Sequence, residues 1–324
     1  MSGKRDRRMT ADDRRRDVPG LAALLREHFG AGIEPLQPLT GGVFSRAYGF
    51  AVEGCEYVVR INSAPHAAGS FAKDEYAGRA FASADLPIPR IVARGATGDW
   101  HYAISERVAG RPLSICSESE RQRALSSALD TLEAVGKADT STSQGYGDWG
   151  VDGNGKFGSW QAYLADVIEN HAEGYYQDWH RLFETSCLER DVYETVYERM
   201  LELSGRCPNE RALIHNDFHF DNVLANGERI TGVVDWANAL YGDPLYDVAW
   251  LDRPSLVPGW WYDDSDILWE RFGGAPDYKT RITCYQLHVG LDHLRYFAKN
   301  ERPEDYQLCR EWLLARIEGD APRS

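Results

Sequence analysis

The first apolar residues of the chain recur at helical spacing. They are Leu21, Leu24, Leu25 and Phe29. Pro19 suits the first turn of such a helix and Gly30 can end it, so a short helix is predicted near the N-terminus. Next, the pattern changes to one typical of strands. A β-hairpin is therefore predicted, with strands at 43–50 and 56–61 around a Glu-Gly turn.

Helical spacing dominates the remainder of the chain. The predicted elements are a helix at 71–84, strands at 91–93 and 101–108, a helix at 118–138, a glycine-rich loop at 144–159, two or more helices within 160–203, and a helical C-terminal part at 250–324. A small part rich in strands, followed by a larger helical part, predicts an α+β fold.

The stretch 213–249 contains two short apolar runs, 213–214 and 230–234, and polar residues follow each run. Apolar strands that end in carboxylates and amides are a common way to position metal ligands and a base. The polar residues concerned are His215, Asp217, Asn222 and Asp235.

These residue types suit phosphoryl transfer. Asn222 and Asp235 offer an amide oxygen and a carboxylate, which can bind Mg²⁺ when phosphate oxygens and water complete its coordination. Asp217 precedes Asn222 by five residues and can accept the proton of an acceptor hydroxyl. His215 is interpreted as a structural hydrogen-bonding residue of the same loop. Phosphoryl transfer needs little more than such positioning and charge neutralisation.

Two glycines precede the first strand of the predicted hairpin. They are Gly41 and Gly42, and Ser45 follows them. Because glycine allows a close backbone approach, N–H groups at this turn can face a phosphate.

The second strand of the hairpin carries Arg60, where protein kinases carry a lysine. Its guanidinium can bind phosphate oxygens and also a carboxylate of the following helix. Asp74 is the favoured partner because it falls near the buried stripe of that helix, and Glu75 is the alternative.

Composition and charge restrict the partners. The chain of 324 residues has a formal net charge of −14, which disfavours nucleic acid and favours cationic partners. Residues 1–17 form a basic tail that is predicted to be disordered. The N-terminus lacks an apolar signal region, and no apolar run of about 18 residues occurs, so we expect a cytoplasmic protein that does not span a membrane. The six scattered cysteines indicate reduced thiols.

The chain resembles the aminoglycoside phosphotransferases, a family with the protein-kinase-like fold, and within it the hygromycin B subfamily, which also carries arginine at the position of Arg60. The segments that carry the resemblance are YVVRIN (57–62), FASADLPIP (81–89), HNDFHFDNVL (215–224), RITGVVDWANALYGDPLYDVA (229–249) and GLDHL (290–294). Trp236 stands where protein kinases have Phe-Gly, which argues against a protein substrate.

The resemblance implies a two-lobed molecule, with a small β-rich nucleotide-binding lobe at 18–108 and a larger helical lobe at 109–324 for catalysis and acceptor binding. It also implies ATP, or GTP, as the donor, with Mg²⁺. The segment 105–110 would be the hinge that contacts the nucleobase, with Ser105 and Arg107 as candidate residues. In the family the roles of base, metal ligand and phosphate-binding residue fall on Asp217, on Asn222 and Asp235, and on Arg60.

The acceptor is expected to be a small cationic sugar such as hygromycin B, bound by carboxylates and aromatic faces. The candidate residues are Asn238, Asp252 and Trp261. We expect the enzyme to act as a monomer.

Two other functions fit parts of the pattern. A kinase for a small metabolite such as choline, homoserine or a fructosamine would use the same fold. A metal-dependent hydrolase would use the alternating residues His215, Asp217, His219 and Asp221, which would share one face if they lay in a strand.

Overall fold

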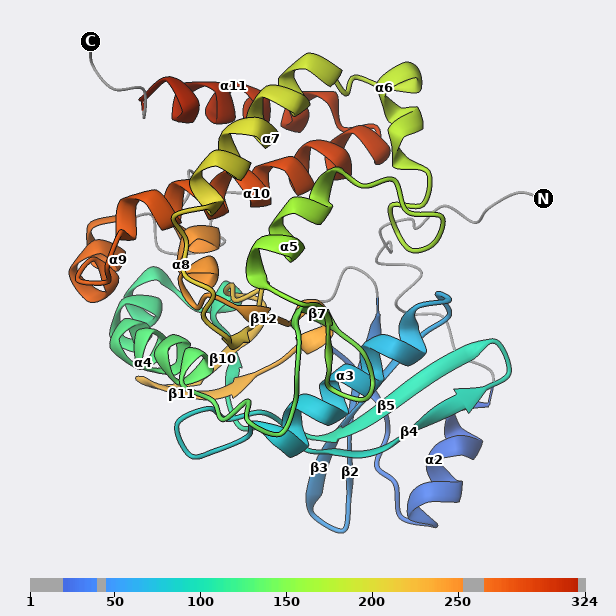
Figure 1. Cartoon of the computed structure of the whole chain (residues 1–324). Coiled ribbons are helices and arrows are strands. Elements are labelled where there is room, and N and C mark those ends of the chain that lie inside the picture. The colour runs from blue at the N-terminus through green and yellow to red at the C-terminus, as the bar shows by residue number, and fades with distance from the viewer. Residues whose placement is uncertain (1–19, 40–44, 253–264, 320–324) are drawn as a thin grey trace. The chain divides into compact units, whose positions relative to one another are not determined.

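The computed structural model describes residues 20–39, 45–252 and 265–319, and its contacts divide the chain into two compact units (Figure 1). Unit 1 comprises the chain up to Ala134 together with 150–153 and 219–239. Unit 2 comprises 135–149, 154–218 and the chain from Leu240 onward. The lobe boundaries given above remain a prediction, and each unit is described by itself.

Unit 1 contains a five-stranded antiparallel sheet in the order β1-β2-β3-β5-β4. Its strands are β1 (Gln37–Pro38), β2 (Arg46–Val52), β3 (Cys55–Asn62), β4 (Ile91–Thr97) and β5 (Trp100–Glu106). The predicted hairpin is confirmed. Glu53 and Gly54 form its turn with φ of 51° and 82°, the left-handed values that a tight two-residue hairpin requires.

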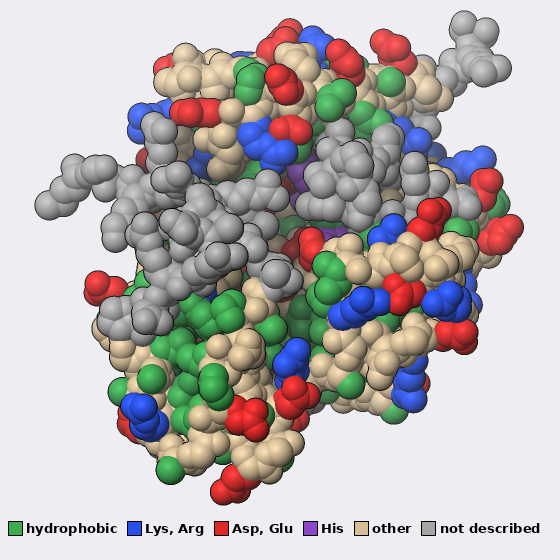
Figure 2. Space-filling view, turned by 180° about the vertical axis from the view of Figure 1, so that it is seen from behind, with side chains coloured by type: hydrophobic (Ala, Val, Ile, Leu, Met, Phe, Trp, Pro, Cys, Tyr) green, Lys and Arg blue, Asp and Glu red, His purple; other side chains and the backbone are tan. Residues whose placement is uncertain are grey.

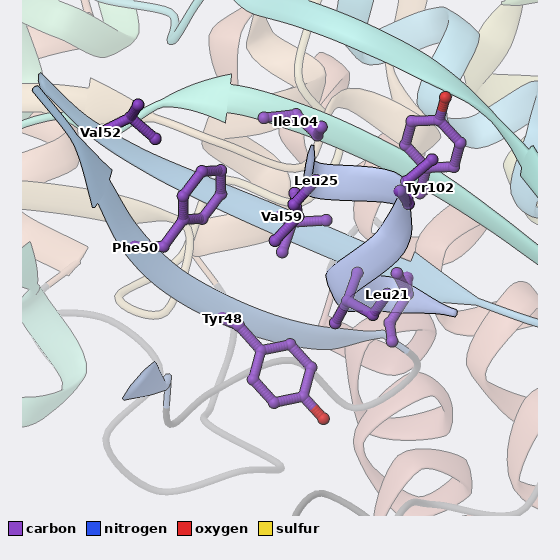
Figure 3. Close-up of a cluster of buried hydrophobic side chains, with 10 residues drawn as sticks. Leu21, Leu25, Tyr48, Phe50, Val52, Val59, Tyr102 and Ile104 are labelled. Atoms are coloured by element: carbon purple, nitrogen blue, oxygen red, sulfur yellow. The ribbon is translucent and has the colours of Figure 1, made fainter. Parts of the chain in front are cut away.

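One face of this sheet is covered by α2 (Leu21–Phe29), whose leucines point into a cluster of buried side chains (Figure 3). The strands contribute Tyr48, Phe50, Val52, Val59, Ile61, Tyr102 and Ile104. Because side chains alternate along a strand, the residues between these point to the opposite face. Arg60 is one of them, and it lies between Ala47 of β2 and Ala103 of β5 in the register.

The opposite face of the sheet is covered in part by α3 (Ala67–Ala80), through Ala67 and Phe71 packed on Ala103. The sequence predicted this helix at 71–84, so the true helix begins and ends four residues earlier. It ends there because Ser83 and Leu86 form two hydrogen bonds across a turn. The N–H of Ser83 donates to the carbonyl oxygen of Leu86, and the N–H of Leu86 donates to Oγ of Ser83. This turn stops the helical pattern.

Unit 1 also contains a three-stranded sheet in the order β11-β10-β6. Its strands are β6 (Arg111–Pro112), β10 (Val223–Asn226) and β11 (Arg229–Val233). The 3₁₀ turn η1 (Leu113–Ile115) follows β6, α4 (Glu118–Gly136) comes next, and η4 (Trp236–Asn238) follows β11.

Unit 2 contains a four-stranded sheet in the order β8-β7-β12-β9. Its strands are β7 (Tyr146–Trp149), β8 (Gly155–Phe157), β9 (Ala212–Ile214) and β12 (Leu240–Gly242). The prediction of an irregular loop at 144–159 was therefore wrong. The glycines serve close backbone packing here, since a Cβ on Gly145, with φ of 74°, would lie 2.2 Å from the carbonyl oxygen of Gly155.

The other elements of unit 2 are helical, and α10 (Tyr278–Lys299) lies at their centre, packed against α7 (Arg190–Ser204), α8 (Leu245–Leu251) and α11 (Pro303–Gly319). The shorter elements are α5 (Trp160–Ala165), η2 (Asp166–Ile168), η3 (Trp179–Arg181), α6 (Leu182–Thr185) and α9 (Ser265–Phe272). The α+β class predicted from the sequence is confirmed. Within the described residues, none of the helices combines the length and apolar character needed to cross a membrane.

On the described part of the face drawn in Figure 2, acidic and basic side chains are interspersed. The excess of acidic residues in the composition does not gather there into a field of one sign.

Candidate active site

Asn222 and Asp235 lie at the same end of the β10–β11 hairpin in unit 1. Asn222 immediately precedes β10, and Asp235 follows β11 by two residues. Val223 pairs with Val233, and the N–H of Val234 donates to the carbonyl oxygen of Asn222 at 3.0 Å. The hairpin therefore brings the two predicted metal ligands to one edge, because antiparallel pairing returns the chain to where it started.

The side chain of Asn222 is oriented by a neighbouring histidine. Its Nδ2 atom lies 3.3 Å from Nε2 of His219, and both residues are mostly buried. The amide oxygen, the atom that a magnesium ion would require, is the other end of the same group.

Asp235 adopts a left-handed backbone conformation, with φ of 67° and ψ of 68°. Such a conformation is costly for a residue with a side chain and persists only where the surroundings hold it. Two contacts of Trp236 do so. Its indole, 1% exposed, donates to the carbonyl oxygen of Val233 at 3.1 Å, and its backbone N–H donates to Oδ1 of Asp74 at 2.7 Å.

The second oxygen of Asp74 binds Arg60, whose Nη2 lies 2.5 Å from Oδ2. The favoured pairing is therefore confirmed, whereas Glu75 binds Arg94 at 2.6 Å on the surface. Burial by itself would lower the pKa of Arg60, but the carboxylates of Asp74 and Asp235 outweigh it and raise the pKa, so the guanidinium stays charged.

Sequence reasoning missed Lys73, the neighbour of Asp74 on α3. Its ammonium donates to the carbonyl oxygen of Ala239 at 3.0 Å, and the residue is only 6% exposed. The partner lies 166 positions further along the chain. No local pattern indicates such a contact, because a lysine in a helix normally reaches solvent.

The loop that carries His215 and Asp217 belongs to unit 2. Asp247 of α8 accepts the backbone N–H groups of His215 and Asn216, each at 2.7 Å. Burial, followed by the nearby Asp217 carboxylate, raises the pKa of Asp247 to about 7, although the two N–H groups oppose the shift. Asp247 thus shapes the loop that presents Asp217.

Asp243 has a different set of partners. It accepts hydrogen bonds from Arg281 at 2.7 Å and 2.5 Å, from the hydroxyl of Tyr285, and from the N–H of Leu245 at the start of α8. Asp243 therefore joins α8 to α10 and does not tie the loop of Asp217.

The basis of the hydrolase hypothesis is wrong. Residues 215–222 form bends and turns and not a strand, so the alternating side chains of His215, Asp217, His219 and Asp221 have no common face. In the described part of the chain, no group of three or more His, Cys, Asp and Glu residues is arranged to hold a metal ion.

The remaining candidate residues are dispersed. Ser45 precedes β2, and Ser105 lies in β5 opposite Val58. Arg107 donates its backbone N–H to the carbonyl oxygen of Glu56 at 3.0 Å, and its side chain binds Glu56 at 3.3 Å. Their roles toward a nucleotide stay predictions.

The acceptor candidates that the structure describes lie in different units. Asn238 ends η4 in unit 1 and is exposed. Asp252 follows α8 in unit 2, and its carbonyl oxygen accepts from Gln286. Gly41, Gly42 and Trp261 lie outside the described residues.

The donor set of unit 1 suits a nucleotide with magnesium. An amide oxygen and a carboxylate at one hairpin end are hard ligands of the kind that Mg²⁺ prefers, and a charged guanidinium shares the same carboxylate network. The order of Arg60, Asp74, Asn222 and Asp235 along the chain is that of a kinase-like phosphate and metal site.

Comparison with known proteins agrees with this chemistry. A model described as "Phosphotransferase enzyme family" matches residues 35–270. The hygromycin-B 4-O-kinase of Escherichia coli is 34% identical over 269 residues, which cover 81% of this chain and 74% of that enzyme.

Solved structures agree as well. The structure of aminoglycoside phosphotransferase APH(4)-Ia has a TM-score of 0.81 at 29% identity, covering 94% of this chain and 99% of the other. A thermostable mutant of it, in ternary complex with AMP-PNP and hygromycin B, has a TM-score of 0.80 at 30% identity, covering 94% and 100%. The protein-kinase-like fold is thus confirmed. The chain belongs to the phosphotransferase enzyme family, the aminoglycoside phosphotransferases that its motifs resemble, and it is a phosphotransferase.

Proposed function

We propose that this enzyme transfers the γ-phosphoryl group of ATP to a hydroxyl of an aminocyclitol antibiotic, with hygromycin B as the acceptor. The observation that carries the proposal is the network of unit 1, in which Asp74 connects Arg60 to the backbone just after Asp235. The identity of 34% to a hygromycin-B 4-O-kinase supports the choice of acceptor.

In this proposal residues 18–108 bind the nucleotide and residues 109–324 carry catalysis and the acceptor. Arg60 holds phosphate oxygens, assisted by backbone N–H groups at Gly41 and Gly42 and by Ser45. Ser105 and Arg107 border the nucleobase of ATP. Asn222 and Asp235 would hold Mg²⁺, which when bound would neutralise the charge of the phosphate oxygens.

The transfer itself needs one base. The acceptor hydroxyl oxygen attacks the γ-phosphorus, the bond from that phosphorus to the bridging oxygen of ADP breaks, and the hydroxyl proton passes to Asp217. His215 and Asp247 hold the loop that carries Asp217, through backbone bonds that the chemistry leaves unchanged. No phosphorylated enzyme intermediate is required.

The acceptor is expected to bind through Asn238, Asp252 and Trp261, with the acidic composition favouring a polycationic sugar. We propose a monomer working in the cytoplasm, where ATP is available.

Consumption of ATP and mass spectrometry of the product test the function directly. Purified enzyme should phosphorylate hygromycin B once, in the presence of Mg²⁺, with a kcat/KM far above that for choline, homoserine or a fructosamine. Preference for one of these metabolites would replace the proposed acceptor but not the reaction. ATP consumption that no acceptor stimulates would contradict the proposal.

A further inference from the structure

The short helical turn that follows Asp235 is held at both ends by two adjacent residues of α3. At its beginning, the N–H of Trp236 donates to Asp74 at 2.7 Å. At its end, the carbonyl oxygen of Ala239 accepts from the ammonium of Lys73 at 3.0 Å. A carboxylate therefore meets the N–H end of η4 and a cation meets its carbonyl end, which is the favourable arrangement for a helical turn.

Lys73 is 6% exposed, so its ammonium has exchanged most of its hydration for contacts within the protein. One of these contacts, to the carbonyl oxygen of Ala239, connects α3 to the end of η4.

The segment that Lys73 holds is the one that must keep Asp235 in its left-handed conformation. Asp74 holds the beginning of this segment and also binds Arg60, so α3 connects the phosphate-binding arginine and the predicted metal ligand. Without the second contact, η4 could rotate about its first bond, and the carboxylate of Asp235 would lose its fixed direction.

We infer that Lys73 is a positioning residue for the metal site: by binding the carbonyl oxygen of Ala239 it keeps η4, and with it the Asp235 carboxylate, oriented for a divalent cation. The inference rests on the proposed function for its metal. The expected effect on the conformation of η4 does not depend on the proposed function, because it concerns the protein without metal or nucleotide.

The test compares Lys73→Met, which removes the ammonium and keeps the length, with Lys73→Arg, which keeps a cationic donor. Glu75→Gln is the matched control, because it alters an exposed ion pair of the same helix. Two quantities are measured in each full-length protein. They are the hydrogen exchange of the amides of residues 236–239 without ligands, and the affinity for Mn²⁺ in the presence of AMP-PNP by electron paramagnetic resonance.

Lys73→Met should accelerate exchange at residues 236–239 at least tenfold and leave the amides of α3 unchanged. It should weaken Mn²⁺ binding at least tenfold, with the affinity for AMP-PNP without metal within about twofold of the parent. Lys73→Arg should recover most of both losses. If Lys73→Met does not fold, Lys73→Arg becomes the decisive variant. Hydrogen exchange and Mn²⁺ affinity like those of Glu75→Gln then support the inference, and a loss of protection and of Mn²⁺ affinity in Lys73→Arg overturns it.

Unchanged exchange and unchanged Mn²⁺ affinity in a folded Lys73→Met would overturn the inference while leaving the proposed function intact. If the parent enzyme binds no Mn²⁺ with AMP-PNP, the proposed function fails, and the metal part of this inference fails with it.

Discussion

Asp74 shows how much a single carboxylate can organise. One of its oxygens binds Arg60 on β3, the other accepts the N–H of Trp236 after β11, and the residue is almost completely buried. Removing either partner would leave a buried charge with fewer hydrogen bonds, and an uncompensated buried charge is costly. Substitutions in this network should therefore change ligand binding and stability together. A substitution of Asp217, the predicted base, should not.

Asp217→Asn tests the base. We expect kcat to fall by about 10²- to 10⁴-fold, because the amide cannot accept the hydroxyl proton. The affinity for ATP should remain within about twofold, since the substitution preserves size. Steady-state kinetics and nucleotide binding measured on the same preparation check both values. Turnover within a few-fold of the parent would remove Asp217 from the role of base.

Arg60→Met tests the phosphate end. We expect the dissociation constant for ATP to rise about tenfold or more, because a guanidinium contact is lost. The free energy of unfolding should fall by about 1–3 kcal/mol, because Asp74 keeps its charge but loses this partner.

Arg94→Met is the matched control for that substitution. Arg94 binds Glu75, and both side chains are more than a third exposed. An exposed ion pair contributes about 1 kcal/mol at most, so stability and ATP affinity should both change little. Equal effects of the two substitutions, seen in urea unfolding and ATP titration, would contradict the assigned role of Arg60.

At the scale of elements, unit 2 depends on buried polar groups where its helices meet. His288 of α10 shares a hydrogen bond of 2.8 Å with the hydroxyl of Tyr246 on α8, and both residues are buried. Arg281 and Tyr285, on the same side of α10, bind Asp243 just before α8. The junction of α8 and α10 is therefore specified by directional bonds as well as by apolar packing.

The acid stability of the protein should depend on His288. Burial lowers its pKa from 6.5 to about 3. The unfolded chain therefore binds a proton in this range that the folded protein does not. This contribution to stability is complete above about pH 6.5 and is lost as the pH falls toward 3, by up to about 1.4 kcal/mol per pH unit.

His288→Gln should make this dependence shallower by that amount between pH 6 and pH 4, measured by urea unfolding at several pH values. His171→Gln, at an exposed histidine, is the control and should leave the slope close to that of the parent. An unchanged slope in His288→Gln would show that His288 does not account for the acid sensitivity.

Gly242 of β12 allows the backbone to lie close to the ring of Trp160 in unit 2. A Cβ at this position would lie 2.2 Å from the ring of Trp160, which is fully buried and bonded through its indole to Tyr285. Gly242→Ala should lower the free energy of unfolding by about 1–3 kcal/mol, because a packed core tolerates extra volume poorly. Gly274→Ala, at a site with open space around it, should be close to neutral in the same denaturation experiment.

At the scale of the whole molecule, the net charge of −14 should affect how a cationic acceptor binds. Salt screens such attraction over about 10 Å at 0.1 M. Raising KCl from about 50 to about 300 mM should increase KM for hygromycin B several-fold and leave kcat nearly constant. A KM that does not depend on salt would show that long-range charge plays no part in acceptor binding.

Sequence patterns were sufficient wherever the structure depends on local order. The hairpin at 46–62, the long helix at 118–136 and the position of polar residues after β9 and β11 follow from spacing and turn residues that lie close together in the chain. They were insufficient where strands pair with distant partners. The strands β7 and β8 were predicted as a loop because a run rich in glycine has no alternation, and β7 becomes a strand by pairing with β12 about a hundred residues later.

The sequence by itself indicated phosphoryl transfer, because it places an aspartate, an asparagine and a second aspartate at spacings typical of that chemistry, in segments that resemble the family. Only the tertiary structure decided which of two adjacent acids on α3 meets Arg60, and that Lys73 binds a carbonyl group far along the chain. The physical reason is that a residue type is a local property, whereas burial and pairing depend on which distant segments pack together.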